Sequence, residues 1–484
     1  MNVKHFLRIN PQLKNDCSNL LWSGYHYCVG ASGTEPTTRA SAIPPKTHTV
    51  TIPLKTAEST VKKPSTAKPP PTTSAPEPPA ITCTYDMCYN ILEVNGQQDP
   101  PGVTAMCKDY FKEKRKESDA FKLFSSLSKP EPKYIARIEY FRLPPRWLFV
   151  KITDEEGNTG WGEASLEGHT QAVEGCLDAW AQRYVGLEAE WVLYAISSTR
   201  KLGIPIYQLL GGKVRNKIRV YAWIGGDRPS DVEAQAVARK AQGFDAVKMN
   251  GTEDLGWLDS PSKLDECVAR VRAVKALGLD AGVDFHGRVH KPMAKQLVAK
   301  LAPHEPLFIE EPLLSENIAG IKEIASQTHC PIALGERLHS RWDVRPFLET
   351  GCVDILQPDI CHVGGISEMR RIASACETYD VALAPHCPLG PIALAANVQV
   401  DAVSPNFAIQ EMSLGIHYNV GGQDLTSYMV DPEVWHVTNG YIDLMAGPGL
   451  GIEIDEEQVR KLSKDSKAWI SPTFVGPGGE LREW

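Results

Sequence analysis

Three acidic residues stand at regular spacing in the second half of the sequence, each after a short apolar run. Asp284 follows AGV, Glu310 follows PLFI and Glu336 follows IALG, and successive acids are 26 residues apart. If these runs are parallel strands of one barrel, their carboxyl ends reach the same rim and the acids converge. Three carboxylates brought together repel one another unless a cation neutralises them, and oxygen ligands suit a hard ion such as Mg²⁺. The pattern therefore predicts a magnesium site, although a single acid after a strand is more often a helix cap.

Two histidines are expected beside these acids. His286 lies two residues after Asp284, so strand alternation predicts that both side chains share one face. His386 ends the run VALAPH, and Asp359 ends the preceding run ILQPD, so neighbouring strands bring the two within hydrogen-bond reach. A buried carboxylate fixes the tautomer of an imidazole and raises its basicity. Glu411 ends the last strand, in AIQEMS, and completes the ring.

The second acid leaves one alternative open. Glu311 stands directly beside Glu310 and could bind the metal instead. Strand alternation predicts that only one of these two side chains points inward.

Together these groups predict the removal of water from a hydroxy acid. A metal ion bound to a substrate carboxylate makes the proton on the adjacent carbon removable, because the cation stabilises the resulting enediolate. In this reading His386 takes that proton, and His286 protonates the hydroxyl that leaves the next carbon. The product is an enol that becomes a 2-keto-3-deoxy acid.

The elements that must position these residues begin near Tyr134. A strand pair with a turn at residues 155–158 and a helix from Thr170 to Tyr184 are expected first. From Ile218 onward, apolar runs alternate with helical stretches such as SKLDECVARVRAVKALG, which predicts a parallel α/β barrel. The eight expected strands are IRVYAWIG, DAVKMNG, AGVDFHG, PLFIEEP, IALGER, VDILQPD, VALAPH and FAIQEMS.

Composition excludes several other classes of protein. The chain has 484 residues and a net charge of −8, which argues against nucleic acid or an anionic membrane as a main partner. No run reaches the roughly 18 apolar residues that a membrane span needs. Seven cysteines, from Cys176 to Cys387, are scattered singly, which is typical of a reduced, cytoplasmic protein. Residues 1–132 include a stretch rich in proline and threonine that we expect to be disordered.

Several runs resemble the galactonate dehydratase branch of the mandelate racemase-like enolase superfamily, over roughly residues 134–484. They are VKMNG, DFHGRV, PLFIEEP, LGER, ILQPD, CHVGGI, LAPHCPLGPIALAA and QEMSLGIHYN. The resemblance implies a modified TIM barrel, (β/α)7β, with an α+β capping domain. It implies a homo-oligomer that converts D-galactonate to 2-dehydro-3-deoxy-D-galactonate and water. The implied roles are Mg²⁺ ligation by Asp284, Glu310 and Glu336, general acid for His286, general base for His386 with Asp359, and enediolate stabilisation by Glu411.

The second barrel strand separates this chain from racemases of the superfamily. Where such racemases often carry a Lys-x-Lys pair, this strand reads Lys248-Met249-Asn250. A racemase needs a base on each face of the carbon, so this site is expected to work from one face. Further substrate contacts implied by the resemblance are Arg146, Trp147, Lys248, Asn250 and His417.

The expected domains are an extension at 1–132, a shortened first part of the cap at 133–200, the barrel at 201–430, and a return to the cap at 431–484. The departure from the family lies at residues 187–200, LEAEWVLYAISSTR, where relatives have a longer helical segment with a Tyr-Arg-Gly-Gly motif. The cap sheet then lacks part of its helical partner. Two alternatives stay open: a dehydratase for another aldonate such as gluconate, and a barrel that binds metal or sugar acid without turnover.

Overall fold

The computed structural model describes residues 49–50, 133–188, 202–253, 255–419 and 422–482. Most of the expected extension, and residues 189–200 of the segment that departs from the family, lie outside these ranges. Within the extension, the two-residue strand β1 (Thr49–Val50) pairs antiparallel with β2. In the described ranges, every helix is too short or too polar to cross a membrane.

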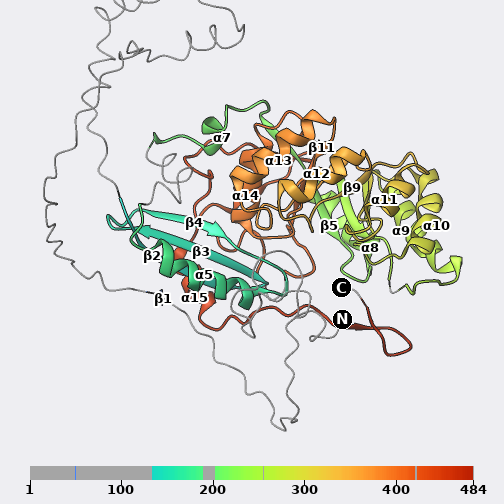
Figure 1. The fold of residues 1–484 in the computed structure, drawn as a ribbon, viewed down its shortest axis with the longest axis horizontal. Helices are drawn as coiled ribbons and strands as arrows, with labels where there is room; N and C mark the ends of the chain where they lie inside the picture. Colours follow the sequence, from blue (N-terminus) through green and yellow to red (C-terminus); the bar gives the residue numbers. More distant parts are fainter. Residues whose placement is uncertain (1–48, 51–132, 189–201, 254, 420–421, 483–484) are drawn as a thin grey trace, which may run out of the picture. The chain divides into compact units, whose positions relative to one another are not determined.

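The cap is an antiparallel sheet with helices from both ends of the barrel sequence. Its strands β2 (Ile135–Leu143), β3 (Trp147–Asp154) and β4 (Thr159–Glu163) pair in that order. The helix α5 (Thr170–Tyr184) has the predicted bounds. Helix α15 (Glu456–Ser463) comes from beyond the barrel and lies against β2, where Arg460 Nη2 is 3.2 Å from Glu139 Oε1. Figure 1 shows the three strands side by side with both helices.

All eight predicted strands form one parallel barrel. The strands β5 to β11 pair in sequence order, and β12 pairs with β5. Leu383 of β11 bridges Phe407, which lies just before β12, and this bridge closes the ring. The strands are β5 (Lys217–Ile224), β6 (Ala246–Asn250), β7 (Asp280–Asp284), β8 (Phe308–Glu310), β9 (Ile332–Leu334), β10 (Ile355–Leu356), β11 (Ala382–Leu383) and β12 (Gln410–Met412).

A helix follows each of the first seven barrel strands, which confirms the predicted (β/α)7β order. These helices are α8 (Val232–Ala241), α9 (Asp265–Ala276), α10 (Lys291–Leu301), α11 (Ile318–Ala325), α12 (Arg341–Thr350), α13 (Ile366–Thr378) and α14 (Pro391–Asp401). Among the described residues, the other elements are α7 (Ile206–Leu209), the 3₁₀ helices η2 (Pro261–Leu264), η3 (Ala302–His304) and η4 (Pro432–Trp435), β13 (Tyr441–Asp443) beside β5, and the hairpin β14 (Phe474–Val475) with β15 (Leu481–Arg482).

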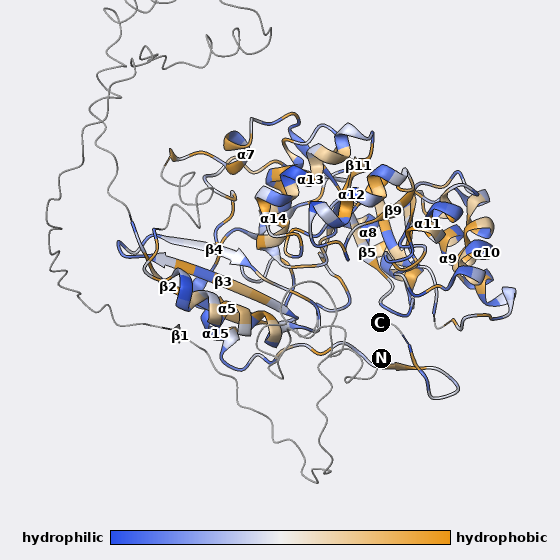
Figure 2. Ribbon diagram, in the orientation of Figure 1, coloured by the Kyte–Doolittle hydropathy of each residue, from blue (hydrophilic) through white to orange (hydrophobic). Residues whose placement is uncertain are grey.

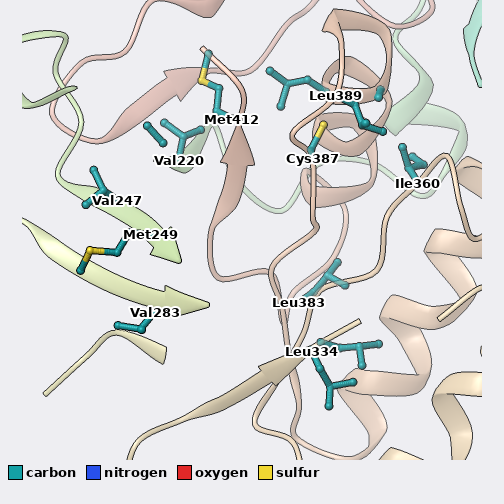
Figure 3. Packing of buried hydrophobic residues seen from close by; sticks show 14 of the residues in the cluster. Val220, Val247, Met249, Val283, Leu334, Ile360, Leu383, Cys387, Leu389 and Met412 are labelled. Carbon is teal, nitrogen blue, oxygen red and sulfur yellow. The ribbon is translucent and has the colours of Figure 1, made fainter. Parts of the chain in front are cut away.

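Alternate residues of the barrel strands face two different cores. Val220, Val247 and Val283 belong to a large cluster that includes the inner faces of the helices, part of which appears in Figure 3. Tyr221 and Ala246 belong to a small cluster of strand residues instead. Figure 2 shows hydrophobic and hydrophilic residues mixed along α10 and α13, as expected for helices with one buried side. The strand ends are therefore held by packing on both faces.

Candidate active site

The three regularly spaced acids lie at the carboxyl ends of consecutive barrel strands. Asp284 is the last residue of β7, Glu310 the last of β8, and Glu336 follows β9 by two residues. All three side chains are buried. The parallel pairing of β7 with β8 sets Asp284 directly opposite Glu310. A close set of buried oxygen donors fits a hard divalent cation, because burial without a counter-charge is costly for each carboxylate.

A buried lysine neutralises part of this charge. Lys248 Nζ lies 2.9 Å from Glu310 Oε1 and 3.0 Å from Glu411 Oε1, and the whole residue is 1% exposed. Gln357 donates to the other oxygen of Glu310, with Nε2 and Oε2 2.8 Å apart. Lys248 therefore points into the barrel, and its ammonium bridges two of the strand-end acids.

Glu311 and His286 reach the same site by a route that strand alternation does not describe. Glu311 directly follows the last residue of β8 and has a φ of 41°. His286 lies two residues after the last residue of β7 and has a φ of 55°. Glu310 meets Lys248 inside the barrel and Glu311 lies beside Asp284, so both acids reach the strand-end cluster, which strand alternation did not predict. Ligand atoms of Asp284, His286 and Glu311 lie within 4.8 Å of one another and form a second set able to hold a metal.

The histidine of the next-to-last strand is held by three acids. His386 Nδ1 is 2.9 Å from Asp359 Oδ2, and its Nε2 is 3.1 Å from Glu336 Oε2 and 3.9 Å from Glu411 Oε2. His286 Nδ1 lies 3.3 Å from Asp284 Oδ2 and 3.7 Å from Glu336 Oε1. The structure thus gathers both histidines around Glu336.

The electrostatics follow from burial and from crowding of like charges. Burial raises the pKa of Glu310 to about 8, with Asp284 and Glu411 adding to the effect and Lys248 opposing it. Burial likewise raises the pKa of Glu311 to about 8 against the opposing charge of Arg337. Burial disfavours the charged form of His386, but Glu336, Glu411 and Asp359 together raise its pKa well above the ordinary value. The crowded carboxylates therefore resist being ionised together, and a bound cation would favour their charged forms.

A second polar cluster joins the cap to the barrel beside His386, and the sequence analysis did not single out two of its members. His362 Nδ1 is 2.9 Å from the backbone oxygen of Glu336, and its Nε2 is 3.4 Å from Glu167 Oε2. Arg146 Nη2 lies 3.9 Å from Glu167 Oε1. The side chains of Arg146, Glu167 and His362 are 3%, 9% and 8% exposed. In the sequence, Glu167 stands in the run GEASLEG and His362 in the run ILQPDICHVGG. Neither position by itself indicated that the two side chains would meet.

Charge–charge contacts shape the titration of this cluster. Burial raises the pKa of Glu167, but His362 and Arg146 outweigh it and bring the pKa down to about 2. Burial lowers the pKa of His362, but Asp359 and Glu167 outweigh it and bring the pKa up to about 9. The pair is therefore ionised at neutral pH.

The other expected substrate contacts lie at different depths. Trp147 is 1% exposed and packs in the core, with its ring stacked on Phe149 at 6.2 Å, so a contact through this ring stays a prediction. The amide of Asn250 donates to the backbone oxygens of Gly226 and Asp227, at 3.2 Å each. His417 is partly exposed, and its ring centroid lies 3.8 Å from that of Tyr418.

The barrel and the acids at its rim define a protein of the enolase superfamily. The family described as "Enolase C-terminal domain-like" matches residues 231–458. A crystal structure of an enolase from Agrobacterium radiobacter, with bound Na and L-malate, has a TM-score of 0.64 and 30% identity, covering 72% of this chain and 99% of the other.

The chain belongs to the D-galactonate dehydratase family within that superfamily. It is 44% identical over 381 residues to the D-galactonate dehydratase of Ralstonia pickettii, covering 72% of this chain and 100% of the relative. The same figures hold for the D-galactonate dehydratase of Pectobacterium atrosepticum. Since 72% of 484 residues is about 350 residues, roughly 30 of the 381 aligned positions have no counterpart in this chain.

Proposed function

We propose that this chain is a Mg²⁺-dependent hydro-lyase that removes water from a sugar acid, with D-galactonate as the substrate. The observation that carries the proposal is the arrangement of two histidines on either side of a buried carboxylate cluster. His386 Nε2 is 3.1 Å from Glu336 Oε2, and His286 Nδ1 is 3.7 Å from Glu336 Oε1. An acid and a base placed around one metal-binding centre suit the removal of a proton and a hydroxyl from adjacent carbons.

Asp284, Glu310 and Glu336 are the residues that would hold Mg²⁺. When bound, Mg²⁺ neutralises the substrate carboxylate and so makes the adjacent C–H more acidic. Glu310 is chosen over Glu311 because the family resemblance assigns it to the metal; Glu311 stays the alternative, with Arg337 Nε 2.9 Å from its Oε2 and its carboxylate near Asp284 and His286. Glu310 instead faces Lys248 and Gln357 inside the barrel, where its charge adds to that of Asp284.

His386 takes the proton from C2 of the substrate. Its Nδ1 is held by Asp359, so Nε2 is the nitrogen directed at the cluster. Against the effect of burial, Glu336 and Glu411 raise the pKa of this imidazole, and a cation held by the strand-end acids would lower it toward the range of a base. Asn250 stands where a second lysine would serve a racemase, and its amide is committed to Gly226 and Asp227. The proton therefore leaves from one face only.

His286 delivers a proton to the hydroxyl on C3. The C2–H and C3–O bonds break, the hydroxyl leaves as water, and the resulting enol becomes a 2-keto-3-deoxy acid. Glu411 accepts from the Cys387 N–H at 2.9 Å and faces Lys248; in its protonated form it donates a hydrogen bond to the carboxylate end of the substrate and so stabilises the negative charge that develops there. Lys248 keeps Glu411 and Glu310 from repelling each other.

The polyol end of the substrate has partners of matching chemistry in Arg146, Glu167 and His362. Among the described residues, Nε and Nη1 of Arg146 and Oε1 of Glu167 are buried without a hydrogen-bond partner. Buried polar atoms left unpaired are costly, and hydroxyl groups would satisfy both the donors and the acceptor. His417 is a further candidate contact at the more exposed side. A homo-oligomer in the cytoplasm remains our expectation for the assembly and its location.

The proposal is tested with the purified full chain. With Mg²⁺ and D-galactonate, a 2-keto acid is expected, and it should be absent with the His386→Asn variant as a matched control. A panel of aldonates that includes gluconate decides the preferred substrate. Melting with and without Mg²⁺ separates binding from turnover: stabilisation by Mg²⁺ with no product from any aldonate would overturn the proposal in favour of a binding-only barrel.

A further inference from the structure

Glu163, the last residue of β4 in the cap, reaches across to the barrel helix α14. Its Oε1 accepts from the Gly390 N–H at 2.8 Å, and its Oε2 accepts from the Ala393 N–H at 3.0 Å. Ser165 Oγ donates to Oε1 at 2.7 Å and itself accepts from the Leu148 N–H at 3.1 Å. The carboxylate is thus fixed to the cap on one side and to α14 on the other.

The carboxylate replaces a cap that α14 cannot supply for itself. Its N-cap residue is Gly390, which has no side chain, and the next residue is Pro391, which has no N–H. The first N–H groups of a helix need acceptors, and a negative charge there is favoured by the helix dipole. Glu163 provides two such acceptors from a distant part of the chain.

The close approach of Glu163 also explains why residue 390 is glycine. Its φ is −82°, which any residue can adopt, so backbone conformation does not require glycine. A Cβ at this position would lie 2.7 Å and 2.8 Å from the two Glu163 oxygens and 3.0 Å from the Trp147 ring. The cap therefore occupies the space that a larger side chain would need.

The loop held in this way carries His386. Gln410 of β12 holds the start of the loop, where its Nε2 donates to the Pro385 oxygen at 3.0 Å. Ser413, just after β12, holds the other end, where its Oγ donates to the Leu389 oxygen at 2.6 Å. Glu163 holds its last residue, Gly390. It also touches the neighbouring loop, since Cys361 Sγ is 3.5 Å from the Glu163 backbone oxygen and Cys361 N–H donates to Asp359 Oδ1 at 2.7 Å.

We propose that Glu163 is a positioning residue for the reaction: by tying the cap to the loops of His386 and Asp359, it fixes the direction in which His386 Nε2 points. The inference rests on the proposed function for its kinetic part. Proton transfer is sensitive to displacements of about 1 Å, so loosening this tie slows the C2 step more than it weakens substrate binding.

The test compares Glu163→Gln, Glu163→Ala and Gly390→Ala with Glu139→Gln. Glu139 is a buried cap carboxylate whose partners, Arg137 and Arg460, lie away from the His386 loop, so its variant controls for general loosening of the cap. With D-galactonate and Mg²⁺, kcat should fall about 10-fold in Glu163→Gln and about 100-fold in Glu163→Ala and Gly390→Ala. KM should change less than about 3-fold, and the C2-deuterium isotope effect on kcat should increase.

Hydrogen exchange supplies a readout that does not need turnover. Amides of residues 386–393 should exchange faster in both Glu163 variants and not in Glu139→Gln. Unchanged kcat and unchanged exchange in Glu163→Ala would overturn the inference, as would losses no greater than those of Glu139→Gln. If the wild-type chain shows no turnover, the proposed function fails, while the exchange measurement still decides whether Glu163 holds the loop.

Discussion

Asp359 and His386 form the buried contact on which the chemistry of the site depends. Oδ2 of Asp359 lies 2.9 Å from Nδ1 of His386, and the same two residues form a parallel bridge between adjacent barrel segments. The other oxygen of Asp359 accepts from the Cys361 N–H at 2.7 Å, so the carboxylate cannot rotate freely. This contact keeps the proton on Nδ1 and turns Nε2 toward the strand-end acids.

Replacing His386 with asparagine should abolish dehydration and leave the metal site. Loss of a general base typically costs 10²–10⁴-fold, so kcat is expected to fall about 1,000-fold or more. Isothermal titration should give a Mg²⁺ affinity close to that of the wild type, since His386 is not among the proposed ligands. A large loss of Mg²⁺ affinity in this variant would contradict the role given to His386.

Replacing Asp359 with asparagine should preserve the fold but remove the group that sets the tautomer. An amide next to Nδ1 can donate as well as accept, so a fraction of the imidazole will present the wrong nitrogen. A fall in kcat of about 10²–10⁴-fold is expected, with little change in KM. The measurement is steady-state kinetics beside circular dichroism, and a variant with wild-type kcat would remove Asp359 from the mechanism.

Much of this site could be predicted because its residues lie at the carboxyl ends of successive barrel strands. Asp284, Glu310 and Glu336 each end or closely follow a strand, and strand order alone brings them together. His386 and Asp359 meet for the same reason. The fold followed from the same alternation of apolar runs and amphipathic stretches.

The rest depends on where the chain turns and on which distant segments meet. Glu311 and His286 have positive φ, whereas strand alternation assumes a continuous extended backbone. Alternation therefore did not predict that Glu311 would reach the cluster together with Glu310. His362 and Glu167 meet across the cap and the barrel, 195 positions apart in the sequence. Pattern and spacing hold no signal for such a pair, because the packing of two domains creates it.

The choice between two adjacent acids as the metal ligand can be made directly. Glu310→Gln should weaken Mg²⁺ binding by 10-fold or more, because it removes an anionic oxygen ligand. Glu311→Gln should change Mg²⁺ affinity much less and instead lower stability, because it leaves Arg337 without its buried partner. Titration calorimetry and thermal melting of the two variants, side by side, decide the assignment. The opposite ranking of affinities would make Glu311 the ligand.

Removing the ammonium of Lys248 should destabilise the protein in a way that Mg²⁺ reverses. Lys248→Met leaves Glu310 and Glu411 buried without their shared counter-charge, which should lower the free energy of unfolding by about 3–5 kcal/mol. Saturating Mg²⁺ should recover part of that loss, since a divalent ion neutralises the same cluster.

Lys151→Met provides the matched control for this experiment. Lys151 is also buried, and its Nζ is 2.6 Å from Glu456 Oε2 in the cap, away from the strand-end acids. Its destabilisation should therefore not respond to Mg²⁺. Denaturant unfolding of both variants, with and without the ion, measures the difference. An equal response in the two would rule out a link between Lys248 and the metal site.

Asp401, at the end of α14, should make stability depend on pH. The residue is fully buried, and among the described residues neither carboxylate oxygen has a hydrogen-bond partner. Burial raises the pKa of Asp401 well above its ordinary value, against the opposing charge of Arg215. A raised pKa means that the folded state binds the proton more tightly than the unfolded state. The stability gained from this tighter proton binding is therefore complete below the pKa that Asp401 has in the unfolded state. It is lost as the pH rises through the pKa that Asp401 has in the folded state.

Asp401→Asn removes this titration while keeping a similar shape. The melting temperature of the variant should exceed that of the wild type at pH 8, and the difference should shrink toward zero below about pH 3, where the aspartate is protonated in both states. Asp443→Asn, at an exposed position of β13, controls for the loss of one negative charge. Differential scanning calorimetry across this range gives the answer. A variant less stable than the wild type at pH 8 would mean that the ionised carboxylate has a partner in solution that offsets its burial.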